Sequence, residues 1–387
     1  MPVTLETPSP TVRQDSGKDP AGNFILSVVV KRTYTISRHR TCVLADAQLP
    51  LCEEPEFDPD DPNLLLNDSD LIPYKLRTDV IVKGHAYGYT GRPQFHALVQ
   101  VGDAAKQILV QGDRRCARSA TGTLRFSAPE PVDRIPLSYT YAYGGRDTVA
   151  EAVWLKEAIA RAPHESPDLR SIAEGSPYAY PRNPSGRGYL VHSTPQAVET
   201  LQLPNLEDPL DPVTPQRLEV GSRLRWPGMP LPWATGWVPA DWFPRIVGLG
   251  LVPMYERMGE PFPEVQRGFI ADSVLRPSSQ DLADPFHLTC GASLDMQLPY
   301  LRGGEPVRLK SLHRAQADWT FSLPAERPAI WTDGRNGRLN PTEPVIHTVV
   351  VEPDEERVSV VWRGSAQALR PYMENELTKM PFRVAWP

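Results

Sequence analysis

The chain has 387 residues, 40% of them hydrophobic, and a formal net charge of −6 from 41 basic and 47 acidic side chains. This acidic balance argues against a nucleic-acid-binding protein, which more often carries a basic patch. The longest apolar runs, such as Phe24 to Val30, are far shorter than the ~20 residues of a membrane-spanning helix. The N-terminus also lacks the basic and apolar regions of a secretory signal. Composition therefore predicts a cytoplasmic protein without nucleic-acid or membrane partners.

Proline is the unusual component, at 43 of 387 residues. Because proline lacks an amide hydrogen and fixes φ, it interrupts helices and stays out of central strands. A chain with this content should have short elements joined by long ordered loops. We therefore expect a mainly β fold, a large antiparallel β-sandwich or barrel-like unit with long Pro/Gly-rich loops and a small helical insertion.

The N-terminal half begins with a polar stretch and continues with strand patterns. Residues 1–22 are predicted to be a mobile tail, and residues 23–387 a single β-rich domain. Strands are expected at 24–36, which is rich in Val, Ile, Thr and Tyr, and at 78–87, 94–102 and 106–112. In 94–102 the apolar residues alternate with polar ones, the period of a half-buried strand. Glycine-containing turns between these runs favour an antiparallel meander.

One helix is expected in the middle of the chain. Thr148 and Glu151 have the spacing of a capping box, and Leu155 and Ile159 follow at helical spacing. Pro163 should stop the helix, because the residue before a proline avoids the α region. We expect a helical insertion over about residues 148–177.

The C-terminal part returns to β patterns. Alternation predicts strands at 319–323 and 358–363, and the run 345–351 is typical of a buried strand. A short helix opened by Pro371 at its first position is expected over 371–379.

Standard catalytic and metal-binding motifs are absent from the sequence. It has no P-loop, no G-x-S-x-G elbow and no H-E-x-x-H helix, and its four cysteines form no C-x-x-C pair. No metal site and no cofactor are therefore predicted. His85 and His96 are expected to be structural residues in strands, although a tertiary pair of His85 with Asp113 or Asp147 stays open.

Four glycine-bearing polar motifs run through the middle and late parts of the chain: YTYAYGGRD (139–147), YPRNPSGRGY (180–189), LPNLEDP (203–209) and YLRGGEPVRL (300–309). In one interpretation their charged groups converge on a polar site, because an arginine fork suits a carboxylate or phosphate. In the other, the glycines supply positive φ at turns and the charged groups tie long loops together. The residues concerned are Gly144, Gly145, Arg146, Asp147, Arg182, Asn183, Arg187, Asn205, Asp208, Arg302, Gly303, Gly304 and Glu305.

A second cluster is aromatic. Four of the nine tryptophans lie among prolines within one segment: Trp226, Trp233, Trp237 and Trp242. Tryptophan is enriched in interface hot spots, so these residues are candidates for a partner-binding surface or an aromatic sugar platform. The alternative is that the rings cover the β core where no helix does so.

The glycine-bearing motifs and several others follow one another along the chain in a distinctive order. The run SDLIPYKLRTDVIVKGHAYG (69–88) is followed by QGDRR, APEP, PLSYTYAYGGRD, PRNPSGRGY, LPNLEDP and LRGGEPVRL. With these motifs, from about residue 24 to about 323, the chain resembles the bacterial domain-of-unknown-function family 2169. Residues 261–297 and the C-terminus fit the family pattern poorly.

The resemblance implies a role in type VI secretion. Members of the family are similar to adaptors or chaperones that each bind one toxic effector and help to load it onto the spike. The expected partners are therefore an effector, with a PAAR-like domain as a candidate point of contact, and a spike protein of the valine-glycine repeat type. The family has no established catalytic residue, so the resemblance implies a non-enzymatic protein and leaves the motif residues without an assigned role.

A different class of function stays open on the residues alone. The polar loops also suit a hydrolase, or a carbohydrate-binding protein, whose site is built from their Arg, Asp and Glu side chains. Such a protein should hold several of these side chains, with free carboxylates, around one concave pocket.

Overall fold

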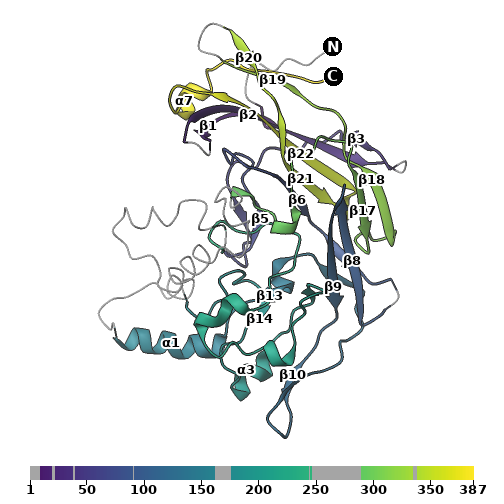
Figure 1. Cartoon of the computed structure of the whole chain (residues 1–387), viewed down its shortest axis with the longest axis vertical. Coiled ribbons are helices and arrows are strands. Elements are labelled where there is room, and N and C mark those ends of the chain that lie inside the picture. The colour runs from purple at the N-terminus through teal and green to yellow at the C-terminus, as the bar shows by residue number, and fades with distance from the viewer. Residues whose placement is uncertain are drawn as a thin grey trace.

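The structure is a computed structural model that describes residues 9–19, 22–37, 40–89, 91–161, 176–243, 245, 289–333 and 338–387. Two large sheets dominate it (Figure 1). Sheet A has the order β1 (Val12–Lys18), β2 (Phe24–Ile36), β22 (Arg357–Gln367), β21 (Val345–Glu352), β6 (Thr78–Val82), β16 (Gln297–Leu298), with β3 (Cys42–Leu44) paired to β2. Sheet B has the order β15 (Leu206–Glu207), β9 (Ala104–Gln111), β8 (Gln94–Val101), β17 (Pro306–Lys310), β18 (Asp318–Ser322).

Smaller sheets and short helices complete the described chain. A three-stranded sheet has the order β20 (Leu339–Pro341), β19 (Ala329–Asp333), β23 (Arg383–Ala385). Two-stranded sheets pair β4 (Glu56–Phe57) with β5 (Leu65–Asn67), β7 (His85–Tyr87) with β12 (Arg134–Pro136), β10 (Cys116–Arg118) with β11 (Leu124–Phe126), and β13 (Tyr143–Gly144) with β14 (Arg187–Gly188). The helices are α1 (Thr148–Arg161), α3 (Pro195–Thr200) and α7 (Glu374–Leu377), and the 3-10 turns are η1 (Tyr139–Tyr141), η2 (Pro215–Arg217), η3 (Arg223–Gly228), η6 (Leu294–Met296) and η7 (Pro353–Glu355).

The main core lies between the two large sheets. Val80 and Val349 of sheet A belong to the same buried cluster as Val99 and Leu309 of sheet B. Packing of two sheets face to face through their apolar sides is the principle of a β-sandwich. The expected mainly β, antiparallel fold is confirmed. The sheets of the described residues stay open, however, and form no closed barrel.

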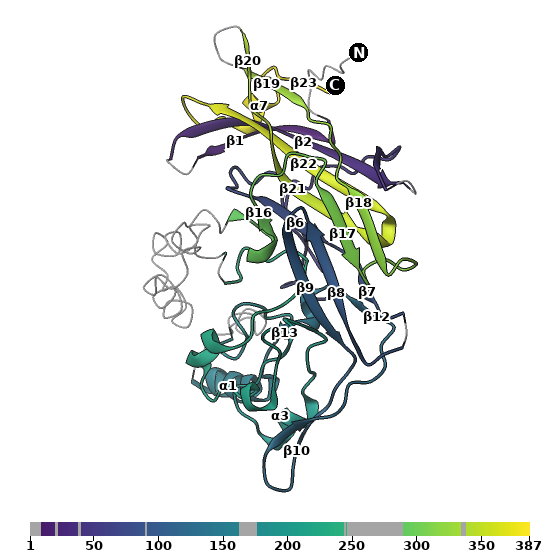
Figure 2. The ribbon, with the colours of Figure 1, turned by 45° about the vertical axis from the view of Figure 1, so that its right-hand side comes forward.

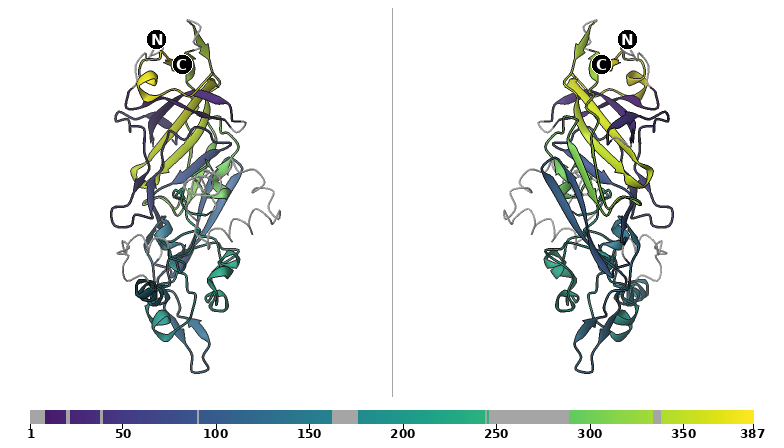
Figure 3. Two further views of the ribbon diagram at one scale, coloured as in Figure 1. Left: turned by 90° about the vertical axis from the view of Figure 1, so that its left-hand side faces the viewer. Right: turned by 90° about the vertical axis from the view of Figure 1, so that its right-hand side faces the viewer.

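A second, smaller core lies at the opposite end of the molecule, around β10, β13, β14 and α3 (Figures 1 and 2). Aromatic rings fill it: Tyr180 is in edge contact with Tyr143 and with Trp226, at centroid distances of 5.2 and 5.9 Å. Few of its residues belong to regular strands or helices, so packed loops form this end, which we call the loop lobe. The views in Figure 3 show the molecule elongated from the sheets to the loop lobe.

Several strands lie where the residue pattern predicts them. β2 occupies 24–36, β21 covers the expected buried run, and in β8 the side chains of Ala97, Val99 and Val101 are buried while Gln94 and His96 are exposed. The expected strand over 78–87 is divided into β6 and β7 at Gly84, whose φ is +148°. The predicted meander is wrong, because β6 lies in sheet A, and β8 and β9 are flanked by β17 and β15.

The predicted mobile tail is wrong for residues 12–18, which form β1 at the edge of sheet A. The sequence VRQDSGK looks like a loop because it has one large apolar residue, Val12. A polar side chain takes the next inward position: Gln14 is buried, and its amide donates to the carbonyl oxygens of Leu377 and Met380 at 2.8 and 2.7 Å. These hydrogen bonds attach β1 to the α7 segment.

Two C-terminal expectations also differ from the structure. In β22 every residue from Val358 to Gly364 is buried, including Ser359 and Arg363, although alternation predicts one solvent-facing side. Sheet A is covered here on its second face, where Leu51 and Leu71 pack on Val29 and Val361. The predicted helix is shorter than expected, because α7 spans only Glu374–Leu377 and Pro371 precedes it.

The described helices are short. The longest, α1, has 14 residues, whereas a bilayer crossing needs ~20 apolar ones. No helix among the described residues therefore has the length and apolar character to cross a membrane.

A buried ion pair fixes β6 to the segment after residue 289. The Asp79 carboxylate accepts hydrogen bonds from the Lys75 ammonium at 2.6 Å and from the backbone amides of Gly291 and Ala292 at 2.8 and 3.0 Å. Asp79 is fully buried and Lys75 is 2% exposed. Breaking such a pair leaves an uncompensated charge in the interior.

We expect Asp79→Asn to lower the free energy of unfolding by about 3–5 kcal/mol, the cost of leaving one buried charge unpaired. Chemical denaturation is the measurement. The matched control is Asp318→Asn, which removes the exposed ion pair with Arg308 and should cost far less, because solvent screens exposed pairs. Equal losses for the two variants would contradict this account.

The buried imidazole of His347 makes stability depend on pH. Burial, with the nearby Arg363 and Lys75, holds the pKa of His347 well below its ordinary 6.5. Below pH 6.5 the unfolded chain therefore takes up a proton that the native state excludes, and stability falls as the pH falls. We expect this residue to contribute a slope of up to about 1.4 kcal/mol per pH unit between pH 6.5 and 5.

This prediction is checked by denaturation at pH 7.5, 6.5 and 5.5 for the wild type and for His347→Leu. The difference between the two proteins isolates His347 from the other histidines. It should be constant above pH 7 and shift in favour of the variant below 6.5. A pH-independent difference would mean that the pKa of His347 is the same in the native and unfolded states, and would contradict this account.

Candidate functional site

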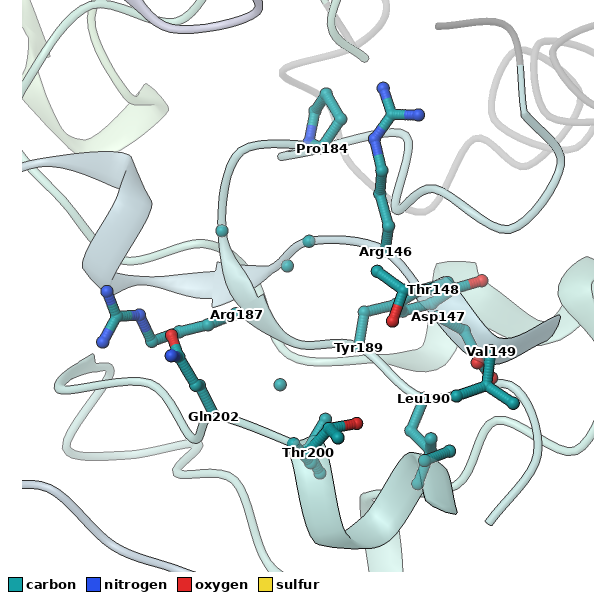
Figure 4. A pocket seen from close by; sticks show the side chains of 16 residues that line it. Arg146, Asp147, Thr148, Val149, Pro184, Arg187, Tyr189, Leu190, Thr200 and Gln202 are labelled. Atoms are coloured by element: carbon teal, nitrogen blue, oxygen red, sulfur yellow. The ribbon is translucent and has the colours of Figure 1, made fainter. Parts of the chain in front are cut away.

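Two of the four glycine motifs surround a cavity of about 300 Å³ in the loop lobe (Figure 4). Residues 144–149 form one wall, residues 184–190 another, and residues 197–202 of α3 and the loop after it close the third side. Of the motif residues, Gly144, Gly145, Arg146, Asp147 and Arg187 line the cavity. Part of the motif set therefore lies around one cavity.

Close backbone packing explains the glycines. Strands β13 and β14 pair in parallel, with Gly144 opposite Gly188. Gly145 has a φ of +91°, and a Cβ atom at this position would lie 2.3 Å from the carbonyl oxygen of Gly186. The Gly145 amide donates to the carbonyl oxygen of Asn183 at 2.8 Å. A glycine here is required both by the backbone conformation and by the contact.

Asp147 is a structural carboxylate at the start of α1. It is 3% exposed, and its Oδ1 accepts a hydrogen bond from the amide of Ala150 at 3.0 Å. Its Oδ2 accepts from the amides of Val191 and His192 at 3.0 and 3.1 Å. The expected capping box of Thr148 is therefore wrong by one residue: Asp147 is the cap, because its side chain bonds the third amide of the helix.

The second residue of the expected capping box has a different partner. The Glu151 carboxylate is 3.0 Å from the Arg146 guanidinium rather than bonded to the start of the helix. The expected helix itself is confirmed over 148–161, and residues 162–175 of the predicted insertion lie outside the described residues. No residue of α1 from 148 to 160 is buried, so the apolar spacing of Leu155 and Ile159 does not produce a core-facing side.

Asn183 and Asn205 join loops through their amide groups. Asn183 is fully buried and donates from Nδ2 to the carbonyl oxygens of Tyr139 and Tyr143 at 2.8 and 3.0 Å. Asn205 Nδ2 donates to the Gln111 carbonyl and to Asp113, both at 3.0 Å. Both side chains thus join backbone groups of segments that are distant in sequence.

Two of the motif arginines, Arg182 and Arg187, pack on aromatic rings. Arg187 donates from Nε to the Thr140 carbonyl at 2.8 Å and from Nη1 to Asn205 Oδ1 at 3.1 Å, and its guanidinium lies 4.3 Å from the ring centre of Tyr141. The Arg182 guanidinium lies 5.1 Å from the ring of Trp226. Planar guanidinium groups suit this combination of hydrogen bonding and stacking.

The remaining motif residues do not line the cavity. The Glu305 carboxylate accepts from the amides of Arg302 and Gly303 at 2.6 and 3.0 Å, which closes a turn before β17. Gly304, with a φ of +84°, donates to Pro324 O. Asp208 accepts from the Leu210 amide at 2.8 Å in a local turn. A single polar site containing all four motifs is thus not formed.

The tryptophan segment is mostly core. Trp226, Trp237 and Trp242 are 2%, 3% and 1% exposed, so the prediction of a tryptophan surface is wrong for these three rings. Trp233 is half-buried: its Nε1 donates to the Gln107 carbonyl at 2.6 Å, and the Lys106 ammonium lies 3.8 Å from its ring centre. The loops of a proline-rich chain bury these rings because few helices are present to cover the sheets.

A histidine–aspartate pair, His85 with Asp354, lies outside the cavity. His85 Nδ1 is 2.7 Å from Asp354 Oδ2, and the Tyr87 hydroxyl donates to Oδ1 at 2.7 Å. Burial and this carboxylate raise the pKa of Tyr87 to about 12. The pairing of His85 with Asp113 or Asp147 is not formed. Asp354 lies 269 residues away in the chain, and no signal in the sequence connects the two.

The cavity can bind through hydrogen bonds but offers no evident catalytic pair. Its walls combine backbone groups and Thr148, Thr200 and Gln202 with the apolar side chains of Val149 and Leu190. Its carboxylate, Asp147, already accepts three backbone hydrogen bonds. Among the described residues no group of three or more His, Cys, Asp and Glu side chains is arranged to hold a metal ion.

Comparison with known proteins gives one match. The model of a family described as "Uncharacterized protein conserved in bacteria (DUF2169)" matches residues 21–363. No curated protein and no solved structure matches the chain.

We expect Gly145→Ala to destabilise the protein by clearly more than Gly122→Ala. Both glycines have positive φ, +91° and +83°, which costs about 1–2 kcal/mol for alanine. Only Gly145 would also place its Cβ against backbone, which adds about 1–3 kcal/mol of overpacking, whereas Gly122 has nothing within 4 Å. The measurement is the free energy of unfolding from urea denaturation. Similar decreases for the two variants would show that the backbone at Gly186 moves to make room for the added methyl group.

Proposed function

Because the chain belongs to this family of uncharacterised bacterial proteins, we propose that it is a non-enzymatic adaptor, or chaperone, of type VI secretion. In this proposal it works in the cytoplasm, where it binds one toxic effector and helps to load it onto the spike. The spike partner is of the valine-glycine repeat type, with a PAAR-like domain as a candidate contact. The proposal rests on the resemblance described above together with the character of the motif side chains.

The main support for the proposal is that the carboxylates of the motifs are already engaged in hydrogen bonds and ion pairs within the fold. Asp147 and Glu305 accept hydrogen bonds from backbone amides. Glu207 pairs with Arg114 and accepts from the Val213 amide at 2.6 Å. Burial raises the pKa of Glu207 despite this pair. Groups engaged in this way hold loops in position, as a binding scaffold requires.

This arrangement counts against the alternative of a hydrolase. Hydrolysis needs a free base or nucleophile beside the substrate, and a pair of carboxylates for sugars. The motif cavity offers Asp147, whose oxygens are occupied, and no second carboxylate lines it. A carbohydrate ligand would therefore bind without a catalytic pair of carboxylates beside it.

The two-lobed shape also supports an adaptor. An adaptor must contact an effector and the spike at the same time, and the chain has separate apolar cores in its sheet region and in its loop lobe. Each end therefore offers a surface backed by its own core, and the two ends lie apart along the long axis of the molecule (Figure 3). Segments that fit the family pattern poorly are then available to determine which effector is bound.

Deletion of the gene tests the proposal. We expect export of one effector, encoded nearby, to be abolished while release of the spike and tube proteins continues, because loading but not firing depends on the adaptor. Secreted protein is measured by quantitative mass spectrometry of culture supernatants. Complementation with the wild-type gene is the control. Unchanged export of every effector would contradict the proposal.

A further inference from the structure

Sheet B has an open edge at β18. Among the described strands β18 pairs only with β17, and the order of the sheet ends with it (Figure 1). The Leu323 amide donates to the Glu305 carbonyl oxygen at 2.9 Å, at the end of this ladder. Because bonded residues alternate along an antiparallel ladder, the backbone groups of Ser322, Thr320 and Asp318 point away from β17.

One of these three residues has a backbone partner on the open side. The Ser322 amide donates to the Arg40 carbonyl oxygen at 3.1 Å, and Thr41 forms a bridge with Ser322. In the part of the chain that the structure describes, no residue bonds the outward backbone groups of Thr320 and Asp318. Free amides and carbonyls at a sheet edge can accept a strand from another protein.

Positive side chains surround this edge. In the ladder Arg308 lies opposite Thr320, and Lys310 lies opposite Asp318. Both basic residues alternate with buried ones along β17, so they lie on the side of the sheet that faces solvent. From the open side, Arg40 Nη1 donates to the Thr320 hydroxyl at 3.0 Å.

One carboxylate, that of Asp318, is shared by these three cations. The Arg308 guanidinium donates to both of its oxygens, at 2.9 and 2.5 Å. These hydrogen bonds, with the charges of Arg308, Lys310 and Arg40, hold the pKa of Asp318 below its ordinary value. Neither Arg40 nor Lys310 forms an ion pair with another described residue. The edge therefore has an excess of positive charge, although the whole chain is acidic.

A cavity of about 440 Å³ adjoins the same edge. Arg40, Thr320 and Ser322 line it at the edge, and Gln100 and Arg308 line it on the face of the sheet. A side chain that projects from a segment laid along β18 thus has space beside the cations. Of these lining residues only Arg308 belongs to one of the glycine motifs.

We propose that the free edge of β18 is a docking site for an extended acidic segment of a partner protein. The segment adds to sheet B as a further strand, and an Asp or Glu side chain beside Thr320 pairs with Arg40 and Arg308. A second copy of this chain does not suit the site, because its own β18 would bring the same positive charge. The inference rests on the proposed adaptor function, since it identifies the surface and the sequence character of the effector segment that would be bound.

Phage-displayed random dodecapeptides provide a direct test. Peptides selected on the full-length protein are synthesised, and their affinities are measured by fluorescence anisotropy. We expect the selected sequences to carry Asp or Glu at alternate positions, because alternate side chains of an added strand lie on the face that holds the cations. Failure to select peptides, or selection of neutral or basic sequences, would contradict the proposal.

Backbone methylation of a selected peptide tests whether it binds as a strand. Successive amides of a strand point to opposite edges, so only one alternating set can bond β18. N-methylation of that set should abolish binding, and N-methylation of the other set should leave most of it. The same result for both sets would show that the peptide does not add to the sheet.

A proline variant locates the binding on the protein. Thr320→Pro removes an outward amide without breaking the ladder with β17, and prolines are tolerated at sheet edges. It should weaken peptide binding by at least about tenfold. The control is Thr320→Val, which keeps the amide and should bind nearly as well as the wild type. Circular dichroism verifies the fold of both variants. Equal binding by the wild type and Thr320→Pro would overturn the site.

Neutralising the cations gives a test that does not depend on the proline variant. The double variant Arg40→Gln, Lys310→Gln should weaken binding by at least about threefold and reduce its salt dependence. The control is Lys156→Gln, Lys379→Gln, which removes the same charge at exposed positions outside the edge. Equal effects of the two double variants would contradict the pairing with acidic side chains.

Export separates this proposal from the adaptor function itself. If gene deletion abolishes export but Thr320→Pro leaves it intact, the adaptor function holds and the docking site is wrong. If deletion has no effect on export, the adaptor function fails, whereas the peptide measurements still decide whether the edge binds an extended segment.

Discussion

The pairing of backbone polar groups in long loops is the constraint on which this structure depends. With 43 prolines, much of the chain cannot continue in helices or central strands. The amides and carbonyls of its loops must therefore find partners elsewhere. Asp79, Asp147 and Asn183 supply them, each buried and each bonded to at least two backbone groups. Side-chain amides and carboxylates thus replace missing secondary structure, and both cores are assembled around them.

This constraint gives the glycine motifs a physical meaning. Glycine allows two segments of the backbone to come into direct contact, as at Gly145 and Gly186. A carboxylate or amide two or three residues away then holds the two segments together. A motif of this kind identifies a family because it encodes a loop shape. It does not by itself encode chemistry, and the separation of the Glu305 turn from the other motifs supports that view. Partner choice is better sought on surfaces outside the motifs.

The sequence predicts those parts of the fold that depend on local pattern. The alternation of β8 and the composition of β2 and β21 locate these strands, since one face or both are apolar. β1 is missed because it is held by pairing with β2 and by the side chain of Gln14, neither of which leaves a local pattern. The candidate site is also predicted only in part, because some of its contacts leave no local pattern in the sequence. Gly144 to Asp147 are recognisable as a turn, but the contact of His85 with Asp354 exists only in three dimensions.

The order of strands in sheet A has a consequence for synthesis. Its neighbours β2 and β22 come from opposite ends of the chain, with Thr35 paired to Arg357 and Ile25 to Gln367 (Figure 1). While the ribosome is still translating the middle of the protein, β1 and β2 exist without their main partner. Such long-range pairing folds slowly and leaves strand edges exposed. The sheet is completed only after the C-terminal segment has left the exit tunnel, so a truncated product leaves the β22 edge of β2 unpaired and becomes a substrate for chaperones and proteases.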